Sequence, residues 1–322
     1  MRSTLDARLR QQLVAERAAR PRPLRSATHL LAQWGAYAAL AVLTLQLDSV
    51  WWKLPIWWVM GWLLVGNGAV VHETLHGHLF PTKAANVAVG VVAGATVGIP
   101  FGVYRAYHLG HHQHSCTADD PEGPPYRFDT RWTYLLIPIG GPLFSAQLLW
   151  WAARCVVGRP PKFFTSAAQR RTAVRDGLIV AVFFAAMVVA AVADLRLVAH
   201  LWLVPWLVAV VVLEPLVLIP EHYGANPLHA ASATATTRTV LSNRFVTWAY
   251  WANNFHTTHH LVAGLVPQSI PRLSRQHVAG ELPPRWVSSG YLAFHWQLLR
   301  HPERFVDADT AATADATAIT AG

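Results

Sequence analysis

The sequence predicts an all-α integral membrane protein with about four transmembrane helices, interfacial or re-entrant helices, and a cytoplasmic histidine-rich cap. Of its 322 residues, 53% are hydrophobic and only 13% are charged, and the apolar residues form long runs. Three histidine clusters lie at the ends of these runs: HETLHGH at 72–78 (box one), HLGHH at 108–112 (box two) and HTTHH at 256–260 (box three). The net charge of +9 is concentrated beside the runs, which indicates membrane orientation rather than nucleic-acid binding.

Residues 1–28 are expected to form a basic segment on the cytoplasmic side. Seven arginines lie within the first 25 residues, and Leu5, Leu9 and Leu13 recur among them at helical spacing. This pattern predicts a basic helix on anionic lipid, with a frayed, solvated tail as an equal alternative. The segment is too polar for a cleaved signal peptide.

The first two spans are predicted at about 30–47 and 54–71, each near the length that crosses a bilayer core. Residues 48–53 would join them outside the cell, where four tryptophans gather as interfacial aromatics do. The second span would return to the cytoplasm and place His72 at its exit.

Two apolar segments, 86–104 and 133–157, are interrupted by glycine and proline. A full crossing by the first would put two histidine clusters on opposite sides of the bilayer. We therefore predict that each segment forms a re-entrant or interfacial hairpin.

Two further spans are predicted at about 177–193 and 197–219, joined by the short turn 194–196. Six basic residues between 154 and 175 favour the cytoplasm for the preceding segment. The last span ends at Pro220, Glu221 and His222, level with the first cluster, so both termini are expected in the cytoplasm. Residues 29–306 would form the membrane domain, and 307–322, rich in alanine and threonine, a disordered tail.

The histidine spacing indicates a metal site. Side chains three and four positions apart share one helix face, whereas adjacent ones such as His111 and His112 diverge by about 100°, so one cluster can serve two neighbouring ions. Imidazole ligands suit iron, zinc, copper or nickel better than magnesium or calcium. Eight or nine of them exceed the needs of one tetrahedral zinc, which favours two metal ions.

These boxes, the additional His222, and the runs HHQHSCTADDPEG and HTTHHLVAGLVPQSIPRL resemble the membrane fatty acid desaturases and related hydroxylases, over roughly residues 30–275. The resemblance implies a di-iron oxidoreductase that uses dioxygen to introduce a double bond into a fatty acyl or similar long apolar chain. A hydroxylase or acetylenase of the same family is the alternative. The implied iron ligands are His72, His76, His108, His111, His112, His222, His256, His259 and His260.

The resemblance also bears on partners and location. No segment resembles the haem-binding HPGG of a fused cytochrome b5, so a separate electron donor, ferredoxin or similar, is expected. The substrate and the surrounding lipid would be the other partners, in the cell inner membrane with the active site facing the cytoplasm. No catalytic residue separate from the metal ligands, and no further cofactor site, is predicted.

Several neighbours of the boxes are candidates for supporting roles. His78 and His114 could each displace a ligand from the set. Glu73, Glu221 and Asn254 could orient imidazoles through the second ring nitrogen. The pair Asp119 and Asp120 could do the same, although Asp-Asp-Pro is also typical of a turn.

Two competing functions fit the sequence less well. HETLH satisfies the H-E-x-x-H zinc motif of metalloproteases, and residues 226–228 (Asn-Pro-Leu) weakly resemble a second motif of intramembrane proteases, but boxes two and three stay unexplained. A metal transporter would place ionisable residues near the middle of its spans, and the predicted spans show almost none.

Overall fold

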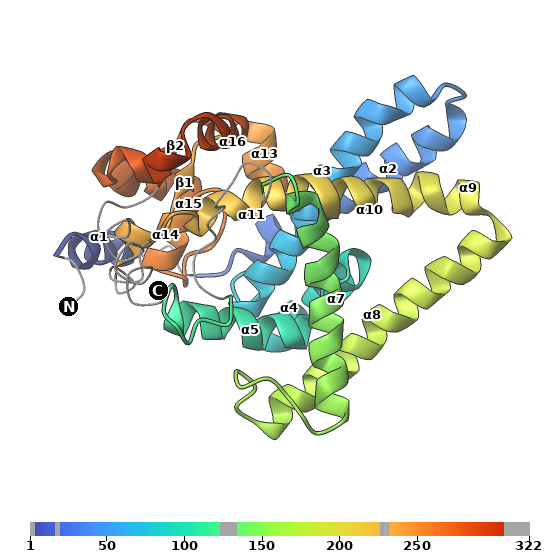
Figure 1. The fold of residues 1–322 in the computed structure, drawn as a ribbon, viewed down its shortest axis with the longest axis horizontal. Coiled ribbons are helices and arrows are strands. Elements are labelled where there is room, and N and C mark those ends of the chain that lie inside the picture. Colours follow the sequence, from blue (N-terminus) through green and yellow to red (C-terminus); the bar gives the residue numbers. More distant parts are fainter. Residues whose placement is uncertain (1–3, 17–19, 123–133, 226–228, 230–231, 306–322) are drawn as a thin grey trace, which may run out of the picture.

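The computed structural model of this chain describes residues 4–16, 20–122, 134–225, 229 and 232–305. Within these ranges the chain is helical apart from two short strands, which confirms the predicted all-α class (Figure 1). The predicted tail 307–322 and the Asn-Pro-Leu triplet 226–228 lie outside the described residues.

Four long helices cover the four predicted spans: α2 (Pro23–Gln46), α3 (Val50–Leu75), α8 (Ala167–Ala193) and the helix Leu195–His222. The last is built from α9 (Leu195–Val198), η1 (Ala199–Leu203), α10 (Val204–Leu207), η2 (Val208–Leu213) and α11 (Glu214–His222), where η1 and η2 are π-helical turns. In the described part of the chain, α3, α8 and Leu195–His222 are long and apolar enough to cross a membrane, and the bent pair α4–α5 makes a fourth candidate; α2, which covers the first predicted span, is not among them. These helices support an integral membrane protein.

The pair α4 (Lys83–Val97) and α5 (Phe101–His114) is bent by 100°. Gly98 allows this bend because its φ of 82° lies in the left-handed region, where a side chain would be strained. The backbone N–H of Gly102 donates to Asp176 of α8 at 2.8 Å, which caps the new helix. The chain thus returns toward the first histidine cluster, and the bent pair fits a broken span as well as the predicted re-entrant hairpin.

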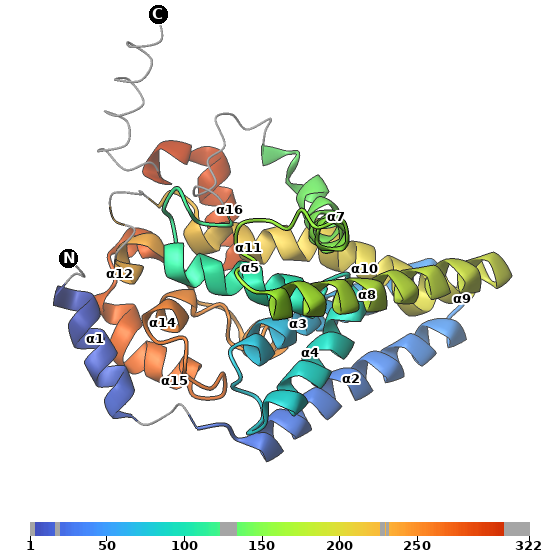
Figure 2. The same cartoon turned by 90° about the horizontal axis from the view of Figure 1, so that it is seen from below.

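The predicted hairpin at 133–157 is wrong for the described residues, because α7 (Ile137–Val156) is one continuous helix. Pro138 lies in its first turn, where no backbone donor is needed, and Pro142 removes only one internal hydrogen bond. Gly141 serves packing instead of a turn, since a Cβ there would lie 1.8 Å from the carbonyl oxygen of Val210. The helix therefore crosses Leu195–His222 closely, and both Figure 1 and Figure 2 show it lying across that helix.

The remaining elements form a cap around the histidine-bearing helix ends. They are α12 (Ala233–Thr236), β1 (Thr239–Val240), α13 (Arg244–Ala249), α14 (His256–Leu261), α15 (Ile270–Leu273), η4 (Ser274–Val278), η5 (Ala279–Glu281), η6 (Pro284–Trp286), β2 (Val287–Ser288), α16 (Tyr291–Arg300) and η7 (Pro302–Phe305). The strands β1 and β2 pair in parallel.

The N-terminal helix α1 (Thr4–Ala15) packs on this cap, as seen in Figure 2. Leu9 and Leu13 are fully buried there, and the Asp6 carboxylate accepts a hydrogen bond from the backbone of Ala233 at 2.8 Å. The helix is as predicted, but its leucine stripe contacts protein rather than lipid, and the frayed-tail alternative is wrong.

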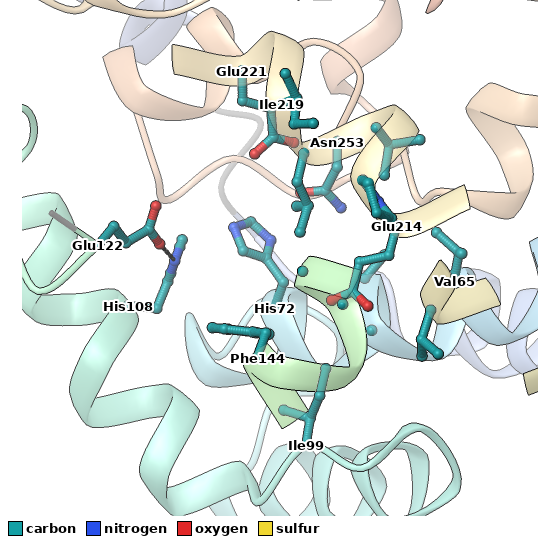
Figure 3. A pocket seen from close by; sticks show the side chains of 18 of the residues that line it. Val65, His72, Ile99, His108, Glu122, Phe144, Glu214, Ile219, Glu221 and Asn253 are labelled. Atoms are coloured by element: carbon teal, nitrogen blue, oxygen red, sulfur yellow. Dashed lines mark ion pairs between the residues drawn. The ribbon is translucent and has the colours of Figure 1, made fainter. Parts of the chain in front are cut away.

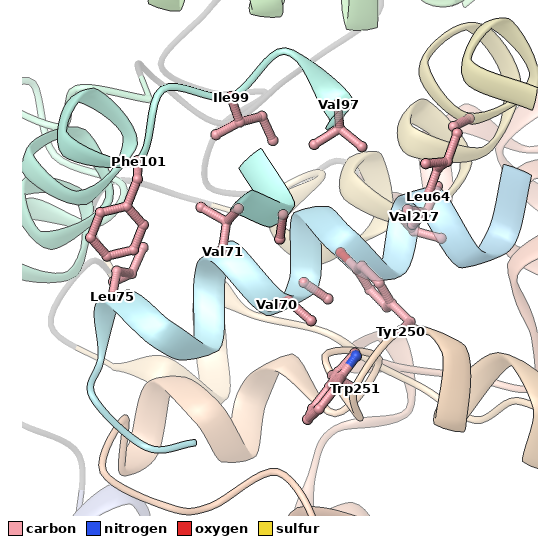
Figure 4. Packing of buried hydrophobic residues seen from close by; sticks show 14 of the residues in the cluster. Leu64, Val70, Val71, Leu75, Val97, Ile99, Phe101, Val217, Tyr250 and Trp251 are labelled. Atoms are coloured by element: carbon pink, nitrogen blue, oxygen red, sulfur yellow. The ribbon is translucent and has the colours of Figure 1, made fainter. Parts of the chain in front are cut away.

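Helix α3 runs through the centre of the hydrophobic core (Figure 4). Its residues Val70 and Val71 are fully buried, among side chains from the α4–α5 bend on one side and from the cap on the other. Because this helix is enclosed by neighbours, its C-terminal end at His72 is held inside the cap rather than at the surface.

Candidate metal centre

Four helix ends bring the histidine boxes together. Box one closes α3, box two occupies the last two turns of α5, His222 ends α11, and box three forms most of α14. Two groups result, and within each group the candidate ligand atoms lie within 4.8 Å of one another. The first holds His72, His76, His108, His112 and His259; the second holds His111, His222 and His260.

The ninth candidate, His256, adjoins the second group, with its Nε2 3.0 Å from Nε2 of His222. Adjacent histidines are divided between the groups: His111 and His112 go to different ones, and so do His259 and His260. This division is the geometry expected from the angle between neighbouring side chains on a helix.

His78 and His114 do not join either group. The ring of His78 turns toward the carbonyl oxygen of Ala263, and His114 is exposed at the end of α5. The structure therefore brings together the nine histidines of the predicted set and leaves out the two flanking ones.

The ring nitrogens that face each group suit a bound cation. Nε2 of His72, His76, His111 and His260 is buried without a hydrogen-bond partner among the described residues. Nε2 of His112 lies 2.9 Å from Nε2 of His259 and 3.0 Å from that of His108. Buried nitrogens that face one another need a shared positive partner, because an unsatisfied polar atom is costly in the interior. The residues thus fit two metal ions that prefer nitrogen ligands.

Hydrogen bonds to the opposite ring nitrogen orient three of these imidazoles. Nδ1 of His72 donates to Glu73 at 2.9 Å, and Nδ1 of His222 donates to the backbone carbonyl of Thr236 at 3.0 Å. Nδ1 of His111 donates to the buried carboxylate of Asp120, 3.0 Å from each oxygen. Each contact leaves Nε2 directed at the metal groups, the arrangement that metal-binding histidines usually have.

Other acidic and polar neighbours have different roles from those predicted. The Glu221 carboxylate accepts from the Tyr250 hydroxyl at 3.0 Å and lies 3.7 Å from Nε2 of His256, on the metal-facing side of that ring. The amide of Asn254 donates to the carbonyl of Val240 at 2.8 Å. Glu122, which sequence reasoning missed, lies 3.6 Å from Nδ1 of His108 and 3.5 Å from Nδ1 of His111. The only sequence feature that could have pointed to Glu122 is its position two residues after Asp120.

Burial keeps box three in the form that binds metals. It lowers the pKa of His256, His259 and His260 well below the usual value, and the neighbouring histidines lower it further. Neutral imidazole is the ligating species, so these side chains are ready to bind a cation without first losing a proton.

A cavity of about 380 Å³ opens beside both groups (Figure 3): His72 and His108 line it from the first group, and His111 and His222 from the second. Its walls are mainly apolar and come from α3, the α4–α5 bend, α7 and α11, with Val65, Ile99, Phe144 and Ile219 among them. The cavity also contains Glu214, an ionisable residue inside the predicted span 197–219. The sequence interpretation overlooked it, although a charged residue within a span is itself a signal.

Comparison with known proteins agrees with this geometry. A family model described as fatty acid desaturase matches residues 49–291. The sn-1 oleoyl-lipid 12-desaturase of Synechocystis sp. is 25% identical over 78% of this chain and 74% of its own length. The beta-carotene ketolase of Paracoccus sp. is 32% identical over 35% of this chain, a match that spans 55% of the ketolase. An acyl-lipid omega-3 desaturase (cytochrome b5) of Arabidopsis thaliana is 29% identical over 31% of this chain and 26% of its own length.

Proposed function

This chain belongs to the fatty acid desaturase family, and on that premise we propose that it is a di-iron membrane enzyme that uses dioxygen to introduce a double bond into a fatty acyl or similar long apolar chain. The observation that supports this proposal most directly is that two groups of histidine nitrogens adjoin one mainly apolar cavity. Hydroxylation of such a chain is the second candidate, because the same site would serve a related oxidation.

The proposed ligands are the nine histidines that converge at the four helix ends. When bound, two irons would pass electrons from the donor to dioxygen and so supply the oxidant that removes hydrogen from an unactivated methylene. Desaturation of one carbon–carbon bond then consumes one dioxygen, two electrons and two protons, and releases two water molecules. The electrons would come from a separate donor, ferredoxin or similar.

The protein's own contribution is to hold and orient the ligands. Glu73, Asp120 and the carbonyl of Thr236 each accept a hydrogen bond from an Nδ1–H group, so His72, His111 and His222 keep their Nε2 lone pairs aimed at the metals. Glu122 adds a carboxylate beside His108 and His111, which balances the positive charge of the ions.

The cavity would position the substrate and exclude water. An extended hydrocarbon can lie against Val65, Ile99 and Phe144 with one methylene pair beside His72 and His108. Two cavity residues, Leu136 of the segment before α7 and Leu218 of α11, are 59% and 38% exposed. We infer that the chain enters between α7 and α11, directly from the bilayer.

The protease alternative is less well supported. A zincin glutamate acts as a base beside the metal-bound water, whereas the Glu73 carboxylate is hydrogen-bonded to Nδ1 of His72, on the side away from the metal groups. His72 and His76 also share their group with three more histidines, too many for one tetrahedral zinc. Glu73→Gln should therefore retain measurable lipid oxidation and bound iron, whereas a protease base would be indispensable.

The test of the proposal is metal analysis together with lipid analysis of a host that expresses the chain. We expect about two irons per purified protein and a new oxidised lipid. His259→Ala should lose the product and part of the iron, while His114→Ala, outside both groups, should keep both. Stoichiometric zinc with peptide cleavage, and no lipid product, would refute the proposal.

A further inference from the structure

Glu214 places a carboxyl group in the wall of the cavity, at membrane depth. It begins α11 and precedes His222 by eight positions, roughly 12 Å along the helix axis. Ionisable side chains are costly inside a membrane protein and are usually kept for function. The metal-binding scheme leaves Glu214 unused, since it belongs to neither histidine group.

The Glu214 carboxyl has no protein partner in the part of the chain that the structure describes. Glu221, one cavity neighbour, accepts a hydrogen bond from Tyr250, but no donor is found for Glu214. Helix α7 passes close to this carboxyl at Gly141: a Cβ there would be 3.1 Å from Oε2 of Glu214. Figure 3 shows the carboxyl directed into the cavity.

The surroundings limit what this carboxyl can bind. Val65, Ile99 and Phe144 line the same cavity, so a ligand group here is shielded from water. Bringing a cation to this depth costs its full hydration, which favours a neutral polar group. A neutral carboxyl has one O–H donor and free acceptor capacity, and a hydroxyl offers the same combination. The two groups can therefore satisfy each other with a pair of hydrogen bonds.

We propose that Glu214 is a specificity residue that binds a hydroxyl group carried by an otherwise hydrocarbon substrate. This inference rests on the proposed function only in assigning the cavity to the substrate. It narrows the substrate class from plain hydrocarbon chains to hydroxylated ones, and it places the hydroxyl roughly 12 Å along the helix from the level of His222.

The test is equilibrium binding of three probes to the full chain in lipid nanodiscs: 1-octadecanol, octadecane and octadecylamine. Wild-type protein should bind octadecanol about 10-fold or more tightly than octadecane, because a buried polar group without its partner is costly. Glu214→Leu should remove this preference, and Glu214→Gln, whose amide also donates and accepts, should keep most of it. Leu218→Ala, in the same wall, should change the affinity for both probes alike.

Equal binding of octadecanol and octadecane by wild type would overturn the proposal and point to a water molecule on Glu214. A preference for octadecylamine that is lost in Glu214→Gln would also overturn it, in favour of a cationic ligand. His259→Ala separates the two proposals, because it should lose metal and keep the hydroxyl preference. Wild-type protein that binds no iron but still prefers octadecanol would refute only the proposed function.

Discussion

Replacing Asp120 by asparagine tests how the second metal group is held. The buried Asp120 carboxylate accepts from Nδ1 of His111 at 3.0 Å and from the backbone N–H groups of Cys116 at 2.7 Å and Glu122 at 2.9 Å. One carboxylate thus ties the histidine to the turn that follows box two. Asparagine keeps one acceptor oxygen but loses the negative charge and the second acceptor.

The expected loss follows from the role of such a partner. Removing a carboxylate that orients a metal-binding histidine weakens metal binding about 10- to 100-fold. This corresponds to about 1.4 to 2.8 kcal/mol at 25 °C. The loss should concern the group of His111, His222 and His260, so about half of the bound iron should become easier to remove.

The assay is competition for iron with a chelator of known affinity, followed by metal analysis. Asp119→Asn is the matched control, because Asp119 is adjacent in sequence but exposed. In a His111→Ala background the Asp120→Asn change should have little further effect, since the histidine it orients is gone. Equal effects of the two asparagine variants, or full additivity with His111→Ala, would refute the reasoning.

Three further predictions concern the ligand set, the packing of α7 and the topology. His222→Ala should lose product and part of the iron in metal and lipid analysis, and full retention of both would mean that the ligand set is wrong. Gly141→Ala should lower the thermal midpoint of unfolding because its Cβ would meet the carbonyl of Val210 at 1.8 Å, whereas Gly140→Ala, with nothing within 4 Å, should leave it unchanged or raise it slightly, since alanine is the better helix former. Single cysteines at Asp119 and Lys162 should be labelled from the same, cytoplasmic side, because α7, which lies between them, is not among the described helices that are long and apolar enough to cross a membrane; labelling from opposite sides would show that α7 spans the bilayer.

The class of fold could be predicted from the sequence because it depends on local pattern. Long apolar runs with basic flanks are sufficient to indicate membrane helices, and α3, α8 and Leu195–His222 lie where the runs predict them. The histidine boxes are equally local, since positions three or four apart on a helix share one face. The nine-residue ligand set came from the family resemblance and stays a proposal.

For two segments the local sequence pattern gave a wrong expectation, and packing between distant parts of the chain explains the difference. The glycines and prolines of 133–157 suggested a chain reversal, but Gly141 is small because Val210 of another helix passes against it. Likewise, Leu9 and Leu13 predicted an amphipathic helix without indicating whether lipid or protein covers its apolar face, and the cap covers it. A residue's size and polarity indicate that it makes a close contact, but which residue it contacts depends on how distant segments pack together.

The tertiary structure alone assigned the acidic residues to their partners. Asp119 and Asp120 are indistinguishable in sequence, yet the turn buries one against His111 and exposes the other. Glu122 reaches two histidines from that same turn, and Glu214 faces a cavity that α3, the α4–α5 bend, α7 and α11 form together. Spacing along a helix determines which side chains share a face, whereas the direction in which a loop or helix presents a carboxyl group depends on contacts between segments distant in the chain.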